Sequence, residues 1–598
     1  METSTETPAI HALLEILEAE GVDAIFGIPG GPISPLYEAL FDRGKMTHIL
    51  AKHEQGAAFM ADGYARVKGT LGLCCTTTGP GATNAITGIA CSYTDCIPVM
   101  LLTAQVAMRA FGKGALQEST QFGVDLVQLF KPVTKLSTML VSHEHLPDMV
   151  RRALRTALTG KRGPVHLNIP ADIAKRPIPY VPIPQHQIRM LSRSVDTASL
   201  REAAWLLAFA ENPCILAGAG VLLSGAHQEL FDLATQLNIP VASTPNAKGV
   251  FPEDHPLSLG VFGFAGHPRA DAYLLGDRVD VLVAVGTSFN ELASHAWDRR
   301  LQPHEALIHI DIDPEQIGKN YATDVGVVGD AKAALHMLLD LVREQTFPPT
   351  NRPSDPLAHV RTEVQRHHHA AQLTSDTLPM KPQRVIAEMQ KVLPQDTLFF
   401  VDAGNCFSWM VHYYEIRQPG TFFQGMGHAA MGHGLVASIG GKVAAPDKTV
   451  VAIGGDAAFA MCGVEIHTAV EHDLPVIWIV LNNRGHGMVY HGDQLLLKRK
   501  LPSSSFRSEL DVATIARSLG AVGVRVETPE ELNKALKRAL VEKKPFVIDT
   551  VIDPEEMPEA LRGRVHTLRE FVSGTLGAVP RSLRLPQQKG PPSPRKGG

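Results

Sequence analysis

Long hydrophobic runs are missing from this sequence of 598 residues. No stretch of about 18 uncharged apolar residues occurs, so no membrane-spanning helix is expected. The N-terminal METSTETPAI has neither a basic region nor an apolar core, and it therefore does not predict a secretory signal. Neither sign of charge dominates, since 56 Lys and Arg residues stand against 61 Asp and Glu residues. Nucleic acid is accordingly not expected as a partner.

Cysteine is scarce and irregularly spaced. The seven cysteines include no CxxC pair, and their odd number does not suit a disulfide framework. Reduced thiols are the simplest interpretation, and they favour a cytoplasmic location. Residues 580–598 are rich in Pro, Gly and Lys and predict a disordered tail.

Three segments of the chain each alternate short apolar strands with helical patterns. This alternation is typical of doubly wound α/β domains with parallel sheets. We therefore expect three such domains, at residues 1–175, 190–350 and 375–565, and interpret the Pro-rich residues 172–200 as a linker. The strands are expected at residues 23–31, 71–77, 99–102 and 164–170, then at 213–220, 239–244, 279–286 and 308–313, and finally at 396–401, 450–453 and 476–481.

Two polar residues follow strands of the third segment. The run VVAI ends in Gly-Gly-Asp456, and the run VIWIVL ends in Asn-Asn483. Because the carboxyl ends of parallel strands meet at one edge of a sheet, Asp456 and Asn483 are expected to lie together. A carboxylate, an amide oxygen and a nearby backbone carbonyl suit a hard dication, which keeps places for phosphate oxygens and water. Either residue alone would be interpreted as part of an ordinary turn or loop, and the pair predicts a site.

This pair resembles the Gly-Asp-Gly…Asn-Asn signature of thiamine-diphosphate enzymes. The motifs His53-Glu54-Gln-Gly-Ala and Thr78-Gly-Pro-Gly-Ala-Thr-Asn84 are similar to those of the acetolactate synthase and pyruvate oxidase-like group of that family. The resemblance covers roughly residues 8 to 565. It implies a pyrimidine-binding, a middle and a diphosphate-binding domain, with the cofactor between the first domain of one subunit and the third of its partner. A homodimer or homotetramer is the expected assembly.

The resemblance implies contacts to the metal and the cofactor. Asp456, the Asn483 side chain and the Gly485 carbonyl are expected to hold Mg²⁺, which in turn holds the diphosphate. Met431 is expected to wedge between the two cofactor rings. Two departures are visible: Ala457 replaces the second glycine, and Asn405-Cys406 stands where Gln-His often occurs. The cofactor-binding residues expected in full are Glu54, Pro80, Asn84, Asn405, Cys406, His428, Met431, Gly455, Asp456, Ala457, Ala458, Asn483, Gly485, His486 and Met488.

Four side chains are expected to take part in the chemistry. A glutamate at a helix start is commonly a solvated or capping residue, but the resemblance implies that Glu54 hydrogen-bonds N1′ of the aminopyrimidine. Gln117 matches a glutamine that points into the active site of the family. His428 and His486 belong to a group of four histidines near the motifs. They are candidates for proton transfer, since imidazole titrates near neutrality.

The middle segment carries a weaker nucleotide signal. Gly218-Ala-Gly220 follows a strand and could cradle phosphates, although a GxG pattern alone is not specific. Acetolactate synthases that bind FAD carry an Arg-Phe-Asp-Asp-Arg-like segment after the strand that ends here at Gly286. This chain has residues 287–295 there, without arginine. A structural middle domain is therefore favoured over bound FAD.

The resemblance implies a carboligase that decarboxylates a 2-oxo acid, with pyruvate as the donor, and transfers the acyl unit to a second carbonyl. A 2-oxo acid decarboxylase, a 2-hydroxyacyl-CoA or oxalyl-CoA lyase, and a non-catalytic cofactor-binding subunit remain as alternatives. The tryptophan with which acetolactate synthases select acceptors has no counterpart here, where His491-Gly492-Asp493 stands nearby. This departure predicts an unusual acceptor.

Overall fold

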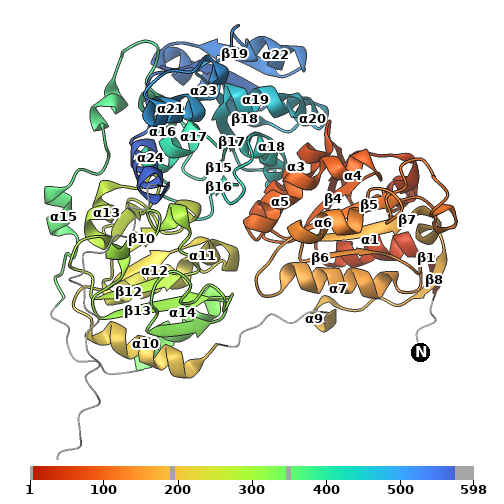
Figure 1. The fold of residues 1–598 in the computed structure, drawn as a ribbon, viewed down its shortest axis with the longest axis horizontal. Helices are drawn as coiled ribbons and strands as arrows, with labels where there is room; N and C mark the ends of the chain where they lie inside the picture. The colour runs from red at the N-terminus through yellow and green to blue at the C-terminus, as the bar shows by residue number, and fades with distance from the viewer. Residues whose placement is uncertain (1–4, 189–194, 345–351, 573–598) are drawn as a thin grey trace, which may run out of the picture.

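Three six-stranded parallel sheets with helices on their faces make up most of the chain (Figure 1). The computed structural model describes residues 5–188, 195–344 and 352–572. The expected architecture of three doubly wound α/β domains is confirmed. The predicted tail at residues 580–598 lies outside the described residues. Within the described ranges, no helix combines the length and the apolar character needed to cross a bilayer.

A small antiparallel sheet of two strands lies beside the first domain. It pairs β1 (Thr5–Pro8) with β8 (Pro177–Tyr180). The buried side chains of Ile178 and Tyr180 alternate with exposed prolines, as expected for a strand with one covered face. The interpretation of residues 172–200 as a linker was therefore wrong for residues 177–180, whose partner strand lies about 170 positions earlier and left no local signal.

The first domain has the strand order β3-β2-β4-β5-β7-β6. The central strand β5 is buried along its whole length, because nearly all of its residues are apolar. Helices α1, α2 and α7 cover one face of the sheet, and α3, α5 and α6 cover the other. The strands are β2 (Ala24–Gly27), β3 (Thr47–Leu50), β4 (Gly72–Thr76), β5 (Val99–Gln105), β6 (Leu136–Met139) and β7 (Val165–Pro170), and the helices are α1 (Ala9–Ala19), α2 (Ser34–Arg43), α3 (Glu54–Lys68), α4 (Pro80–Asn84), α5 (Ile86–Thr94), α6 (Leu126–Phe130), α7 (Leu146–Leu158) and α8 (Ala171–Ala174).

The middle domain has the strand order β11-β10-β9-β12-β13-β14. One face is covered by α10, α12 and α14, and the other by α13 and α15. The strands are β9 (Cys214–Ala217), β10 (Val241–Ser243), β11 (Ser258–Val261), β12 (Val281–Val285), β13 (Ala306–Asp311) and β14 (Val325–Val328), and the helices are α10 (Thr197–Phe209), α11 (Ala219–Ser224), α12 (His227–Leu237), α13 (Pro268–Leu274), α14 (Ala331–Glu344) and α15 (Ala358–Glu363).

The third domain has the strand order β16-β15-β17-β18-β20-β19. Helices α16, α17 and α23 cover one face of its sheet, and α18, α20 and α22 cover the other. The strands are β15 (Leu398–Val401), β16 (Phe422–Gln424), β17 (Val450–Gly455), β18 (Val476–Asn482), β19 (Val522–Val526) and β20 (Phe546–Val551), and the helices are α16 (Pro382–Val392), α17 (Asn405–Tyr413), α18 (His433–Ala444), α19 (Asp456–Cys462), α20 (Ile466–Glu471), α21 (Gly487–Leu497), α22 (Val512–Ser518), α23 (Pro529–Glu542) and α24 (Glu559–Val572).

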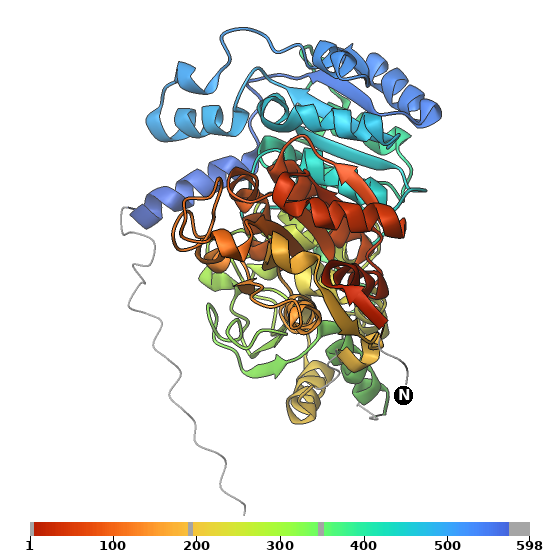
Figure 2. The same ribbon diagram turned by 90° about the vertical axis from the view of Figure 1, so that its right-hand side faces the viewer.

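Helices α3 and α18 pack directly against each other and join the first domain to the third. A single hydrophobic core runs through this contact from one sheet to the other. Small residues allow the close approach: a Cβ atom at Gly440 would overlap the carbonyl oxygen of Met60, and one at Gly63 would overlap that of Ala437. Figure 2 shows the first domain in front of the middle domain and below the third. The packing of α3 on α18 thus fixes how the two outer domains face each other.

Candidate cofactor site

The metal half of the candidate site forms where β17 and β18 end. The two strands pair in parallel register, and Asp456 and Asn483 directly follow their last residues. Asp456 is wholly buried, and its carboxylate accepts hydrogen bonds from the backbone N–H groups of Gly485 (2.9 Å) and Ala457 (3.0 Å). Burial raises the pKa of Asp456 to about 6. The structure therefore brings Asp456 and Asn483 together, as the strand pattern predicted, and Gly485, which the resemblance implied, lies beside them.

Three oxygen atoms converge at this point. The side-chain oxygen of Asn483 lies 3.0 Å from the carbonyl oxygen of Gly485 and 3.1 Å from Oδ1 of Asp456. Acceptors so close together repel each other unless a donor or a cation lies among them. Turning the Asn483 amide by 180° would place its N–H₂ group between the other two oxygens and remove this repulsion. A bound dication would remove it with the amide in its present orientation. A carboxylate, an amide oxygen and a carbonyl form the all-oxygen donor set that Mg²⁺ prefers, so these residues fit the metal that the sequence predicted.

The backbone next to these oxygens is suited to an anion. Helices α17 and α19 begin after Gly404 and Gly455, and neither has a side-chain cap. N–H groups in the first turn of an uncapped helix attract negative charge such as a diphosphate. Ala457 and Ala458 are the first residues after Asp456 on α19 and lie buried. The methyl group of Ala457, the departure seen in the sequence, therefore points into the protein core.

Asn405 and Cys406 open α17 and differ in their surroundings. Nδ2 of Asn405 lies 3.0 Å from Nδ1 of His491, and its buried Oδ1 has no partner in the described part of the chain. The thiol of Cys406 donates to the carbonyl oxygen of Asp402 (3.1 Å), and burial raises its pKa. The Cys406 side chain thus lies in the core. Only the backbone of Cys406 is available for the cofactor contact that the sequence predicted.

Asp402 is a buried residue beside the candidate site that the sequence did not predict. It is wholly buried at the end of β15 and accepts hydrogen bonds from the N–H groups of Gly432 (2.9 Å), Leu435 (3.1 Å) and Ala403 (2.8 Å). Burial raises the pKa of Asp402 to about 6. These bonds fix the start of α18 directly after Met431. Its position in the sequence could have indicated it, because Asp402 directly follows β15 just as Asp456 directly follows β17.

Met431 and Met488 lie on opposite sides of the third-domain sheet. Met431 is half-buried and packs against the core shared by the first and third domains. Met488 is half-buried in the first turn of α21 and packs against the core on the other face. Both residues stand next to loops that end at the carboxyl edge of the sheet.

The four histidines near the motifs fall into two pairs. His428 is exposed, and the half-buried His486 packs edge-on against Phe506 with a ring separation of 6.1 Å. The other two are buried and occupied, because His433 Nε2 lies 2.8 Å from Oδ1 of Asp62 and His491 Nε2 lies 2.9 Å from the carbonyl oxygen of Pro554. The described structure thus leaves the imidazoles of the two predicted catalytic histidines accessible.

The pyrimidine half of the site surrounds Glu54, the first residue of α3. Nδ2 of Asn84 donates to Oε2 of Glu54 (3.0 Å), and a Cβ atom at Gly81 would stand 3.0 Å from Oε1. The hydroxyl of Thr78 donates to the carbonyl oxygen of Gln117 (3.1 Å), which holds the Gln117 loop over the turn that begins α4. The structure therefore gathers Glu54, Asn84 and Gln117, together with the exposed Pro80, in one place.

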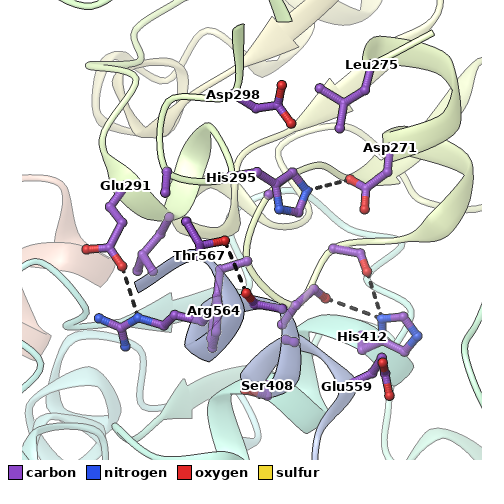
Figure 3. A pocket seen from close by; sticks show the side chains of 18 of the residues that line it. Asp271, Leu275, Glu291, His295, Asp298, Ser408, His412, Glu559, Arg564 and Thr567 are labelled. Carbon is purple, nitrogen blue, oxygen red and sulfur yellow. Dashed lines mark hydrogen bonds and ion pairs between the residues drawn. The ribbon is translucent and has the colours of Figure 1, made fainter. Parts of the chain in front are cut away.

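The two halves are separate within one chain. Among the described residues, no hydrogen bond or ion pair joins Glu54, Asn84 or Gln117 to the oxygen cluster around Asp456. Two large cavities lie elsewhere and contain none of the expected cofactor residues. One of about 580 Å³ lies at the carboxyl ends of the middle-domain strands. The other, of about 860 Å³, lies between the middle domain, α17 and α24 (Figure 3).

Ion pairs line the larger cavity and join its walls. Figure 3 shows Arg564 of α24 reaching Glu291 of the middle domain, with Nε to Oε1 at 3.0 Å, and His295 reaching Asp271, with Nε2 to Oδ1 at 2.7 Å. The Asp271 carboxylate raises the pKa of His295 against the opposing effect of burial. This cavity is part of the contact between the middle domain and α24, separate from the candidate cofactor site.

The chain thus combines three α/β domains with an oxygen cluster in the third and a buried glutamate in the first. Residues 9–125 match the N-terminal TPP binding domain of thiamine pyrophosphate enzymes, residues 200–338 their central domain, and residues 402–550 their C-terminal TPP binding domain. The chain belongs to the thiamine pyrophosphate enzyme family, as the sequence motifs implied.

Relatives within this family extend over nearly the whole chain. A probable acetolactate synthase large subunit of Methanocaldococcus jannaschii is 38% identical, over 91% of this chain and 92% of the relative. The acetolactate synthase isozyme 3 large subunit of Escherichia coli is 33% identical, over 91% of this chain and 95% of the relative. An acetolactate synthase large subunit of Corynebacterium glutamicum is also 33% identical, over 94% of this chain and 90% of the relative.

Proposed function

We propose that the protein is a thiamine-diphosphate-dependent carboligase of the acetolactate synthase type. It would decarboxylate a 2-oxo acid, with pyruvate as the donor, and transfer the acyl unit to a second carbonyl. The relatives at 33–38% identity support this reaction class. The observation that carries the proposal is the convergence of the Asp456, Asn483 and Gly485 oxygens at the end of two strands. The same chain also contains the buried Glu54, which accepts a hydrogen bond from Asn84.

Each residue of the two half-sites has a role in this proposal. Asp456, Asn483 and Gly485 would hold Mg²⁺ through three oxygens, and the first turns of α17 and α19 would face the diphosphate. When bound, thiamine diphosphate supplies an electron sink for breaking and forming the carbon–carbon bond next to a carbonyl. Glu54 would hold a proton at the aminopyrimidine, and Asn84 keeps its carboxylate in place. Gln117, His428 and His486 are the groups available to orient substrate and move protons.

We further propose that the complete site forms between two copies of the chain, in a homodimer or homotetramer. In the described residues, no hydrogen bond or ion pair joins the two halves, and neither half lines one of the two cavities described above. A second copy related by twofold symmetry would bring the Glu54 half of one chain to the Asp456 half of the other. Each dimer would then hold two active sites.

The acceptor is proposed to be unusual for this reaction class. The chain has His491 and Gly492 in the region where a tryptophan that selects the acceptor would be expected. A Cβ atom at Gly492 would have open space around it. The half-buried Met488 and Tyr490 and the exposed Val489 lie on the same first turns of α21, beside this space. A larger or differently shaped carbonyl compound would therefore be accommodated.

The middle domain is proposed to be structural, and bound FAD is not favoured. The glycines of its GxG turn are explained by packing, since a Cβ atom at Gly220 would stand 2.7 Å from Cα of Gly286. The adjoining cavity is crossed by an ion pair between Lys161 and Asp313 (Nζ to Oδ2, 2.9 Å). A visible absorption spectrum of the purified protein tests this point, because a bound flavin would absorb blue light and colour the protein yellow.

A cytoplasmic location stays a prediction from the scattered cysteines, all seven of which are free thiols in the structure.

Product analysis tests the proposed function most simply. The protein would be incubated with thiamine diphosphate, Mg²⁺ and pyruvate, with and without a panel of aldehyde, ketone and 2-oxo acid acceptors. We expect CO₂ release together with a new carbon–carbon product that depends on the acceptor. Free acetaldehyde as the main product would favour a simple decarboxylase instead. Turnover of oxalyl-CoA or a 2-hydroxyacyl-CoA would favour a lyase, and cofactor binding without turnover of any substrate would favour a non-catalytic subunit.

A further inference from the structure

A buried glutamate of the third domain holds the backbone of the first domain directly before Glu54. Glu465 is the last residue of η8 (Gly463–Glu465), which continues α19, the helix that begins with Asp456. Its side chain is buried, and burial raises its pKa. A buried carboxylate is costly unless its oxygens are hydrogen-bonded, so its partners show what it stabilises.

Four hydrogen bonds account for both oxygens of Glu465. Oε1 accepts from the backbone N–H groups of Lys52 (3.0 Å) and His53 (2.9 Å). Oε2 accepts from the N–H of Lys52 (3.1 Å) and from the hydroxyl of Thr468 (2.9 Å). The carboxylate also fills the space beside Gly56, where any Cβ atom would overlap Oε1. Glu465 is therefore fitted to the turn that leads into α3.

This contact sets the direction in which α3 begins. His53 is the extended N-cap residue of α3, and its own side chain accepts a hydrogen bond from the N–H of Gln55 (3.1 Å). Glu54 follows as the first helical residue. Because the N–H groups of residues 52 and 53 are both fixed by one charged acceptor, the backbone that carries Glu54 has little freedom to rotate. Hydrogen bonds to an ionised acceptor are stronger than neutral ones, which suits this holding role.

A second contact between the same two domains lies further along α3. Asp62 is wholly buried, and its Oδ1 lies 2.8 Å from Nε2 of His433, which opens α18 after the Met431 turn. The Arg66 guanidinium holds the pKa of Asp62 below its usual range against the opposing effect of burial. The third domain thus holds α3 at two points, through Glu465 before its first residue and through His433 at Asp62.

We propose that Glu465 is a positioning residue for Glu54, because its carboxylate holds the backbone that leads into α3. This inference rests on the proposed function. Glu54 is the first residue of α3, so the direction in which this helix begins decides where its carboxylate lies. Glu465 fixes that direction from the third domain.

The test compares Glu465→Gln with a matched control, Glu471→Gln. Glutamine keeps the size of the side chain, but it carries no charge and offers one acceptor oxygen where the carboxylate offers two, so the bonds to the backbone N–H groups of residues 52 and 53 are weakened. Glu471 also contacts Lys52, through a salt bridge to its side chain, without touching this backbone. Hydrogen–deuterium exchange of the cofactor-free protein gives the first measurement. We expect faster exchange in the peptide covering residues 50–56 for Glu465→Gln only. Unchanged exchange there would overturn the positioning role, whatever the reaction of the protein is.

Kinetics and cofactor titration give the second measurement. For Glu465→Gln we expect kcat to fall by about 10- to 100-fold, as for the loss of hydrogen bonds to a charged group, while the Kd for thiamine diphosphate with Mg²⁺ stays within about threefold. An unchanged kcat in Glu465→Gln would overturn the positioning role. Failure of the wild type to bind the cofactor would overturn the proposed function instead, and the exchange experiment would still decide whether Glu465 holds the turn.

Discussion

At the scale of single residues, two buried aspartates with similar surroundings have different roles. Asp402 and Asp456 each follow a strand of the third-domain sheet, and burial raises the pKa of each to about 6. Both carboxylate oxygens of Asp402 accept hydrogen bonds from backbone N–H groups, and these bonds order the turn at Met431. Oδ1 of Asp456 also lies 3.1 Å from the side-chain oxygen of Asn483, which lies 3.0 Å from the carbonyl oxygen of Gly485. Only the second arrangement offers the set of oxygens that suits a cation, so burial alone does not identify the metal ligand.

The pKa of Asp456 makes a prediction for metal binding. Since the folded pKa is raised above the ordinary value of 3.8, the carboxylate is protonated below about pH 6 in the metal-free protein. Mg²⁺ requires the ionised form, so its affinity should be constant above pH 7 and fall about tenfold per pH unit below about pH 6. Titration of Mg²⁺ by calorimetry between pH 5 and 8, with thiamine diphosphate present, measures this dependence.

The same experiment on Asp456→Ala is the control. We expect Mg²⁺-dependent cofactor binding to disappear at every pH. The raised pKa also means that the contribution of Asp456 to folding is favourable below the unfolded pKa and is lost as the pH rises through about 6. The cofactor-free variant should therefore be no less stable than the wild type at pH 7.5. Cofactor affinity that is unchanged in Asp456→Ala would contradict the metal assignment.

At the scale of helices and strands, the sequence predicted what depends on local pattern. Short segments rich in apolar residues predicted β4, β5, β7, β9, β12, β13, β15, β17 and β18 near their observed positions, because strands buried on both faces have this composition. Edge strands such as β3 and β14 were not predicted, since they are short and partly exposed. Asp456 and Asn483 were found from their places at strand ends. Glu465 was not, because its role exists only when the third domain packs on the first.

The contact between α3 and α18 makes a prediction for stability. Substituting Gly440→Ala would place a methyl group against the carbonyl oxygen of Met60, and the helices would have to move apart. We expect a loss of about 1–3 kcal/mol, the usual cost of overpacking, seen as a lower midpoint in thermal unfolding.

Gly563→Ala on α24 is a suitable control for this substitution. Its Cβ atom would meet open space, and alanine is the better helix former, so no loss of stability is expected. Equal effects of the two substitutions on the unfolding midpoint would show that the close approach of α3 and α18 does not contribute to stability.

At the scale of the whole molecule, the account depends on how the two half-sites combine. One chain provides a pyrimidine half around Glu54 and a diphosphate half around Asp456, and the described residues show no bond between them. The α3–α18 contact and Glu465 hold these halves at a fixed distance within the chain. A rigid single chain of this kind provides the parts of two incomplete sites. Two copies would provide two complete ones.

Complementation between two inactive variants tests this central claim most directly. Glu54→Gln and Asp456→Ala chains with different affinity tags would be co-expressed, and the mixed dimers purified through both tags. Each homodimer should be inactive, since every one of its sites lacks either the glutamate or the metal ligand. The mixed dimer should have one intact site and one doubly altered site, and we predict half the wild-type kcat with an unchanged KM for pyruvate. A mixed dimer as inactive as the two homodimers would contradict the shared site and place both halves of the cofactor within a single chain.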